Sequence, residues 1–380
     1  MFRQFLALCM VISLTLAVIL PVNAASGITV TNSAVESSFP SSLTFKISTQ
    51  SSSQISEIRL HYTTEQLSFA RVTSEAFLVF TPSTSVNAEW TWDLRQSGGI
   101  PPGAIISYWW TINDKSGNSL TTGQSQFSFE DTRFKWQKIT QDKTTLYWYN
   151  GTQSFADDIM STTQQALVRL ARDTGATLQD PIRIYLYANS SDLLGSMLFP
   201  QDWTGGVSFT ESGCIVIGIS SANITWGRTA IAHELTHLVT HQMTLNPYNG
   251  LPTWLEEGLA MYNQGSVDIS FTSALQTAIS NKSLLTLKTL SSPFSAYANI
   301  SYLSYAESWN AVDYLIKTYG KDKMEQLLET FHQGSTYDNA LLKVYGLDTK
   351  GLSAQWLKTL LPTTTGESIE SNEPALASNY

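Results

Sequence analysis

The segment that decides the fold reads Ala232-His233-Glu234-Leu235-Thr236-His237 and lies inside an apolar run typical of a helix. Residues four apart on an α-helix differ by about 40° around its axis, so His233 and His237 project from one face, one turn apart. Both imidazoles can therefore reach one ion at about 2.0–2.1 Å. Glu234 lies beside them but is angled away from ligation, as a general base requires. The pattern predicts a zinc site with an adjacent base.

The same His-Glu-x-x-His spacing also occurs by chance, in amphipathic helices whose histidines cap or pack. A third ligand is needed to decide. His241 lies one further turn along, but three ligands spaced four apart on a straight helix splay away from a common point. The metzincin arrangement needs Gly and His three and six residues after the second His, and Thr240 and Met243 occupy those positions. That family is excluded.

A second motif follows, because residues 251–260 read Leu-Pro-Thr-Trp-Leu-Glu-Glu-Gly-Leu-Ala. Trp-Leu-x-Glu-Gly-x-Ala after His-Glu-x-x-His resembles the gluzincin zinc metallopeptidases and, more narrowly, the bacterial peptidase MA-like family. The resemblance implies that Glu257, directly before Gly258, is the third zinc ligand. Glu256 and Glu257 are about 100° apart on a helix, so only one of them can face the metal. Spacing alone would also admit Glu256.

The resemblance covers residues 134–361 and implies one Zn²⁺ per chain, held by His233, His237 and Glu257. The ion would activate a water molecule, and Glu234 would take its proton as the water attacks a peptide carbonyl. The expected substrate is a peptide or protein. The Gly-x-Met-x-Asn signature of larger gluzincin aminopeptidases is absent from the sequence, which puts N-terminal trimming in doubt.

Two supporting roles are expected beside the metal. Related peptidases use a Tyr or His to stabilise the oxyanion, and Tyr305 is the candidate here, with Tyr302 as the alternative. Imidazoles that bind a metal also need a hydrogen-bond partner for their other ring nitrogen. Asn263 is the residue that we expect to supply one.

The first 24 residues have the pattern of a secretory signal peptide. Arg3 supplies the positive start, an apolar run spans 5–20, and Val22-Asn23-Ala24 supplies a small-residue cleavage site. An uncleaved membrane anchor is the alternative, because the run approaches the length of a short span. We expect a secreted or extracytoplasmic protein, with no membrane span once residues 1–24 are removed. Of the two cysteines only Cys214 would then remain, which excludes an intrachain disulfide.

Hydrophobic periodicity predicts a multidomain chain. Residues 25–132 alternate polar and apolar side chains in short runs such as 43–47 and 58–62. They predict an all-β sandwich similar in architecture to immunoglobulin or fibronectin type III modules. Residues 133–363 become helical in period and predict an α+β, mostly helical metallopeptidase domain of the gluzincin type. Residues 364–380 are polar and acidic without periodicity and predict a disordered tail.

The charge balance excludes other classes of partner. The chain carries 22 Lys plus Arg against 31 Asp plus Glu, a net charge of −9, so we expect no binding of nucleic acid through a basic face. Charged residues make up only 14%, below the roughly 25% of ordinary globular domains. Neutral polar side chains must therefore wet the surface. No pattern in the sequence indicates an oligomeric state.

Two functions follow from these features. The first is a secreted zinc metallopeptidase. The second is a cell-surface or extracellular binding or adhesion protein, in which the β-sandwich is the active part and the metal site is not catalytic. Glu234 favours the first, because a closed structural zinc site does not need a base beside it.

Overall fold

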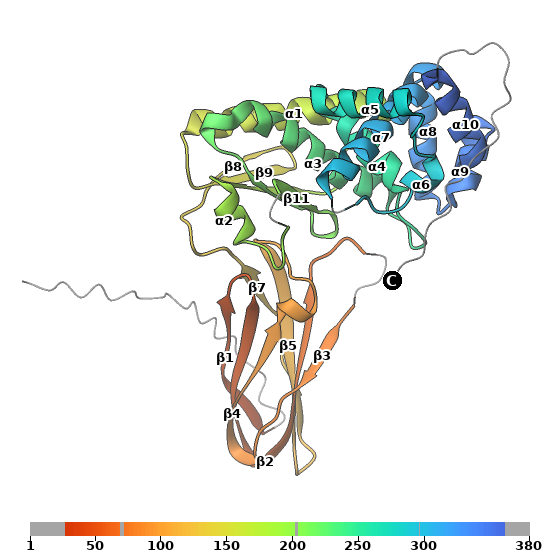
Figure 1. Cartoon of the computed structure of the whole chain (residues 1–380). Coiled ribbons are helices and arrows are strands. Elements are labelled where there is room, and N and C mark those ends of the chain that lie inside the picture. Colours follow the sequence, from red (N-terminus) through yellow and green to blue (C-terminus); the bar gives the residue numbers. More distant parts are fainter. Residues whose placement is uncertain (1–26, 69–71, 202–203, 296, 362–380) are drawn as a thin grey trace, which may run out of the picture. The chain divides into compact units, whose positions relative to one another are not determined.

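The computed structural model describes residues 27–68, 72–201, 204–295 and 297–361. The expected signal peptide and the expected disordered tail lie outside the described residues. The chain divides into two compact units, residues 1–152 with 182–221, and residues 153–181 with 222–380. We call them the β-rich unit and the helical unit, and Figure 1 labels most of their helices and strands. No helix in the described part of the chain is both long and apolar enough to cross a membrane.

The β-rich unit contains a seven-stranded sheet in which every pair of strands is antiparallel. Its central path is β1-β2-β5-β6, with β3 and β4 also paired to β2 and β7 paired to β5. Along β5 buried side chains alternate with half-exposed ones, the period-two pattern that predicts strands in this region. The prediction of an N-terminal β-rich region is confirmed. The elements are β1 (Ile28–Ser38), β2 (Ser42–Thr64), β3 (Ser74–Phe77), β4 (Ser83–Asp93), the 3-10 helix η1 (Leu94–Gln96), β5 (Ala104–Asp114), β6 (Ser119–Thr121) and β7 (Ser125–Phe129).

Strand β2 differs from its prediction. The runs 43–47 and 58–62 predict two strands, but both lie in one strand of 23 residues. Its first half pairs with β1 and β4 and its second half with β3 and β5. The pairing registers shift on either side of Ile55, which is the mark of a β-bulge. A bulge bends a strand without ending it, so the polar residues between the two runs do not form a turn.

A five-stranded sheet completes the β-rich unit, in the order β11-β12-β10-β9-β8. The three inner strands are parallel, and the edge strands β8 and β11 are antiparallel to their neighbours. Parallel strands are usually buried on both faces, and the apolar runs that form β10 and β12 are buried almost throughout. The elements are β8 (Gln137–Gln141), β9 (Thr144–Trp148), β10 (Ile182–Tyr187), α2 (Ser190–Leu194), β11 (Gly206–Phe209), the 3-10 helix η2 (Thr210–Ser212) and β12 (Cys214–Gly218).

A buried aspartate joins the two sheets of the β-rich unit. Asp131 is fully buried just after β7 and accepts hydrogen bonds from the guanidinium of Arg133, at 2.6 Å, and from the phenol of Tyr187 on β10, at 2.9 Å. A buried charge must be paired in this way. The predicted boundary between residues 25–132 and residues 133–363 falls between Asp131 and Arg133, which are hydrogen-bonded to each other. The two domain ranges stay a prediction.

The helical unit holds the residues of the two sequence motifs. In it α3 packs against α1, α4 and α8, while α4 and α5 both pack against α7. This part is mostly helical, as predicted. Its elements are α1 (Gln153–Thr174), α3 (Ile224–Thr244), α4 (Thr253–Asn263), α5 (Ile269–Asn281), α6 (Leu287–Leu290), α7 (Ala298–Tyr319), α8 (Lys321–His332), α9 (Tyr337–Tyr345) and α10 (Thr349–Leu360), and the 3-10 turn η3 (Ser221–Asn223) precedes α3.

Candidate metal centre

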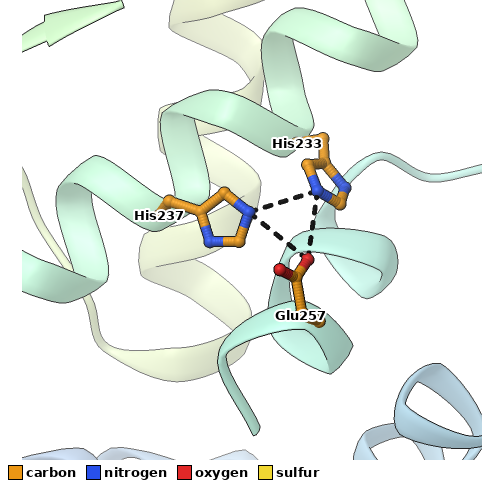
Figure 2. A group of neighbouring side chains, drawn as sticks. All are labelled: His233, His237 and Glu257. Carbon is orange, nitrogen blue, oxygen red and sulfur yellow. Dashed lines mark hydrogen bonds and ion pairs between the residues drawn. The ribbon is translucent and has the colours of Figure 1, made fainter. Parts of the chain in front are cut away.

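Helix α3 carries the two motif histidines on one face. Leu235 and Leu238 on other faces are fully buried, whereas His233 and His237 keep 17% and 13% of their side-chain surface exposed. Their Nε2 atoms lie 3.2 Å apart, and Figure 2 shows the two rings converging. The spacing of four residues therefore brings both imidazoles to one place.

Helix α4 brings a carboxylate to the same place. Oε2 of Glu257 lies 3.4 Å from Nε2 of His233 and 3.5 Å from Nε2 of His237, as the dashed lines of Figure 2 show. Only 19% of the Glu257 side chain is exposed. Among the residues that the structure describes, these three form the one group of His, Cys, Asp or Glu side chains that could hold a metal ion.

The glycine after Glu257 fixes the orientation of α4. A Cβ at Gly258 would lie 2.6 Å from Cγ2 of Val312 and would overlap the carbonyl oxygen of Ser308, both on α7. Atoms this close cannot coexist without a shift of the helices. Gly258 thus allows the close contact of α4 with α7, and this contact determines which way the preceding carboxylate points.

The three residues fit a zinc ion. Ligands at about 2.0–2.1 Å around a tetrahedral ion lie about 3.3–3.4 Å from one another, and the three atoms here are 3.2, 3.4 and 3.5 Å apart. Oε2 of Glu257 is buried without a hydrogen-bond donor in the described part of the chain, which a cation would remedy. Two imidazoles and one carboxylate are ligands that zinc accepts, and three protein ligands leave a fourth position for water.

In this group of three side chains, burial and the neighbouring charges shift the pKa values in opposite directions. Burial raises the pKa of the Glu257 carboxyl, but the imidazoles of His237 and His233 outweigh it and hold this pKa well below its ordinary range. Burial lowers the pKa of His237, but the carboxylates of Glu257, Glu256 and Glu234 raise it well above its ordinary value. Glu257 is therefore ionised at neutral pH, as a metal ligand must be, and a bound cation would replace the proton on His237.

Glu256 lies on the other side of the same imidazole. Its Oε1 is 3.6 Å from Nδ1 of His237, and 40% of its side chain is exposed. A histidine that binds a metal through one ring nitrogen commonly has a carboxylate beside the other nitrogen, which fixes the tautomer and the ring orientation. The geometry favours Glu257 as the ligand and Glu256 as the neighbour that orients His237.

Glu234 follows His233 on α3 and is half-buried. Its negative charge adds to the rise in the pKa of His237 and of Tyr305, and its place in α3 next to His233 puts it beside the candidate ligands. A carboxylate that stands beside the ligands without being one of them has the position of a general base. Its catalytic role stays a prediction.

Of the two candidate tyrosines, the geometry favours Tyr305. Its ring centroid lies 6.4 Å from that of His233. Burial raises the pKa of Tyr305 far above its ordinary value, and the carboxylates of Glu257 and Glu234 add to the rise, so the phenol keeps its proton and can donate. Tyr302 is 41% exposed and contacts Phe271, with 4.9 Å between the ring centroids.

The expectation for Asn263 is wrong. Its amide nitrogen donates to Oγ1 of Thr236 at 2.8 Å, and its backbone carbonyl accepts from Arg169 at 3.2 Å. These bonds tie α4 to α3 and to α1, so Asn263 supports the centre by packing instead of by a bond to an imidazole. Glu256, which the sequence presents only as an alternative ligand, is the carboxylate beside Nδ1 of His237, at 3.6 Å and without a hydrogen bond.

Sequence reasoning also missed Phe271 and Phe294, whose rings flank Tyr305 at centroid distances of 6.3 and 5.1 Å. They come from α5 and from the segment before α7, and no motif includes them. Aromatic residues at such positions are usually core residues, so the sequence contains no signal that distinguishes these two.

Solved structures similar to this chain share little of its sequence. An M1 zinc metallopeptidase from Deinococcus radiodurans is 10% identical, with 90% of this chain and 97% of that chain covered and a TM-score of 0.38. OgpA from Akkermansia muciniphila, in complex with an O-glycopeptide substrate, is 9% identical over 28% of this chain and 30% of its own, with a TM-score of 0.22. A β-1,3-glucan binding domain of carbohydrate-binding module family 56 is 17% identical over 26% of this chain and 96% of its own, with a TM-score of 0.17. At these TM-scores none of the three carries an argument about function.

No curated protein sequence matches the chain. A family model described as the Peptidase MA superfamily matches residues 162–362, more than half of the 380 residues. The matched stretch includes His233, His237 and Glu257. The chain therefore belongs to the Peptidase MA superfamily, in agreement with the gluzincin-type resemblance of its two motifs.

Proposed function

We propose that the protein is a secreted zinc metallopeptidase that hydrolyses peptide bonds at the centre formed by α3 and α4. The observation that supports this most directly is the mutual distance of 3.2–3.5 Å between Nε2 of His233, Nε2 of His237 and Oε2 of Glu257. Glu234 beside this group favours hydrolysis over a structural metal site, because coordination by two histidines and Glu257 does not require another acidic group next to them.

The roles of the residues follow from their chemistry. Zinc supplies a Lewis acid and acidifies water when it is bound to His233, His237 and Glu257. Glu234 takes one proton from the water as the new C–O bond forms, and then passes this proton to the amine nitrogen as the C–N bond breaks and the carbonyl re-forms. Tyr305 keeps its proton and donates a hydrogen bond to the oxygen that gains negative charge.

Glu256 holds His237 in the orientation that this chemistry needs. With Nδ1–H of His237 directed to Glu256, the lone pair of Nε2 faces the point between the three ligand atoms.

The remaining parts of the proposal rest on the sequence. Residues 1–24 would direct export and be removed. Residues 25–132 would form an immunoglobulin- or fibronectin-like accessory domain that orients the enzyme or holds substrate. Residues 133–363 would form the peptidase domain. Mass spectrometry of the protein recovered from the medium of its host tests the export step. A mature chain that begins at Ala25 supports it, and an intact N-terminus contradicts it.

Hydrolysis of a broad peptide library by the purified protein tests the proposed function. Cleavage should be lost in the presence of a chelator and restored by added zinc. Cleavage that persists in the metal-free protein would show that another site is responsible. A zinc-loaded protein that cleaves no peptide would favour a binding or adhesion protein with a non-catalytic metal site.

A further inference from the structure

Four aromatic side chains extend outward from the metal centre. Tyr305 lies 6.4 Å from His233 between ring centroids, and the rings of Phe294 and Phe271 lie 5.1 and 6.3 Å from that of Tyr305. Tyr302 continues the series, 4.9 Å from Phe271. We call Tyr305, Phe294, Phe271 and Tyr302 the aromatic cluster. Its members come from α5, from α7 and from the segment that precedes α7.

The aromatic cluster is not closed off from solvent. Tyr302 is 41% exposed, and Tyr305, Phe294 and Phe271 are half-buried. Large apolar side chains that gather at the surface next to a reactive centre indicate a surface that binds a ligand. Single exposed apolar residues would need no such explanation.

The surface of the aromatic cluster favours an apolar occupant. Aromatic rings gain most from covering apolar surface, whereas a carboxylate placed against them would lose its hydration without gaining a hydrogen bond.

We propose that the aromatic cluster binds a bulky apolar side chain, aromatic or large aliphatic, of a substrate residue adjacent to the cleaved bond. This inference rests on the proposed peptidase function and adds a substrate class to it. An extended peptide rises about 3.3 Å per residue, and the centroid of Tyr305 is 6.4 Å from that of the ligand His233. The side chain of a residue next to the scissile bond can therefore reach the aromatic cluster. Because the cluster begins at Tyr305, which contacts His233 in the metal centre, we assign a substrate side chain as its occupant.

The activity experiment compares zinc-loaded proteins on peptides that differ only in the residues flanking the cleaved bond, which are Phe, Ala or Asp. The wild type should prefer Phe over Ala by roughly 10-fold or more in kcat/KM and should cleave the Asp peptides worst. Phe271→Ala and Phe294→Ala should reduce the Phe preference to about twofold, with the larger loss of kcat/KM on the Phe peptide. Phe271→Leu keeps apolar bulk and should retain most of the preference.

Phe77→Ala is the matched control, because Phe77 is a 61% exposed phenylalanine on β3 of the β-rich unit. It should leave the preference unchanged. A wild type that cleaves peptides without favouring bulky apolar residues would overturn the inference and leave the proposed function intact. Phe271→Ala and Phe294→Ala variants that retain the full preference for the Phe peptide would also overturn the inference.

A binding experiment separates this inference from the proposed function. Calorimetry on zinc-loaded Glu234→Gln, with the same Phe and Ala peptides, should show the Phe peptide bound roughly 10-fold more tightly, with a more negative heat-capacity change. Adding Phe271→Ala should remove that difference. This result shows that the aromatic cluster binds the apolar side chain whether or not the wild type cleaves the peptide, and equal affinities for the two peptides contradict the inference.

Discussion

Oε1 of Glu256 lies 3.6 Å from Nδ1 of His237, while Oε2 of the next residue, Glu257, lies 3.5 Å from Nε2 of the same ring. Two adjacent carboxylates thus face the two nitrogens of one imidazole. Adjacent side chains leave a helix about 100° apart, so both carboxylates can face one imidazole only if the ring lies between them. We therefore propose that the Glu-Glu pair of the second motif supplies one ligand and one group that orients His237.

The first prediction concerns zinc affinity. Glu257→Ala removes a ligand and should abolish stoichiometric zinc binding, whereas Glu256→Ala removes only the partner of Nδ1 and should weaken binding by about 10–100-fold. Competition with a chelator of known affinity measures both. Equal losses in the two variants, or zinc retained by Glu257→Ala, would contradict the assignment.

The second prediction concerns the oxyanion. Tyr305→Phe removes the phenol donor and keeps the ring, so kcat should fall by about 10²–10³-fold while zinc content and KM change little. Tyr302→Phe is the matched control and should retain wild-type kcat. If Tyr305→Phe is as active as the wild type, another donor stabilises the oxyanion.

The third prediction concerns the contact between α4 and α7. Gly258→Ala places a Cβ 2.6 Å from Cγ2 of Val312, so it should lower the free energy of unfolding by about 1–3 kcal/mol and weaken zinc binding. Gly250→Ala is the control, because a Cβ there meets no atom within 4 Å, and it should change stability by less than about 0.5 kcal/mol. Chemical denaturation at fixed zinc concentration compares them. Equal stability of the two variants would show that α4 can move away from α7 without lowering the free energy of unfolding.

The fourth prediction concerns pH. Glu307 on α7 is fully buried and accepts a hydrogen bond from the backbone N–H of Leu285 at 3.0 Å. Burial raises the pKa of Glu307 from 4.5 to about 8. The folded protein therefore holds this proton more tightly than the unfolded chain does. Its stabilising contribution is complete below pH 4.5 and is lost as the pH rises through about 8.

Glu307→Gln removes this titration. Between pH 6 and pH 9 the Tm of the wild type should fall further than that of Glu307→Gln, by roughly 5 °C, as measured by calorimetry at fixed zinc concentration. Glu329→Gln changes an exposed carboxyl on α8 and should keep the wild-type dependence on pH. The same slope in Glu307→Gln and in the wild type would show that Glu307 is not the group responsible.

The sequence predicted most of what is local. His233 and His237 are four residues apart on one helix, so their convergence follows from helix geometry alone. The choice between Glu256 and Glu257 depends on how α4 is rotated, and that rotation follows from the contact of Gly258 with α7. Spacing within α4 contains no information about this contact, so only the family resemblance pointed to Glu257.

The features that the sequence did not predict also depend on contacts between separate elements. Asn263 lies at the end of α4, and its amide reaches Thr236 because of the way α3 and α4 cross. The aromatic cluster combines residues from α5, α7 and the segment before α7, which no local pattern links. In the β-rich unit the alternation identified both halves of β2 as separate strands, whereas a bulge near Ile55 keeps the strand continuous.

The central claim is that this centre binds zinc and uses Glu234 as a base. The most direct test measures zinc content and peptide hydrolysis in parallel, in the wild type and in Glu234→Gln. We predict one zinc per chain in both proteins and hydrolysis by the wild type alone. A Glu234→Gln variant that binds zinc and cleaves peptides at the wild-type rate would contradict this claim.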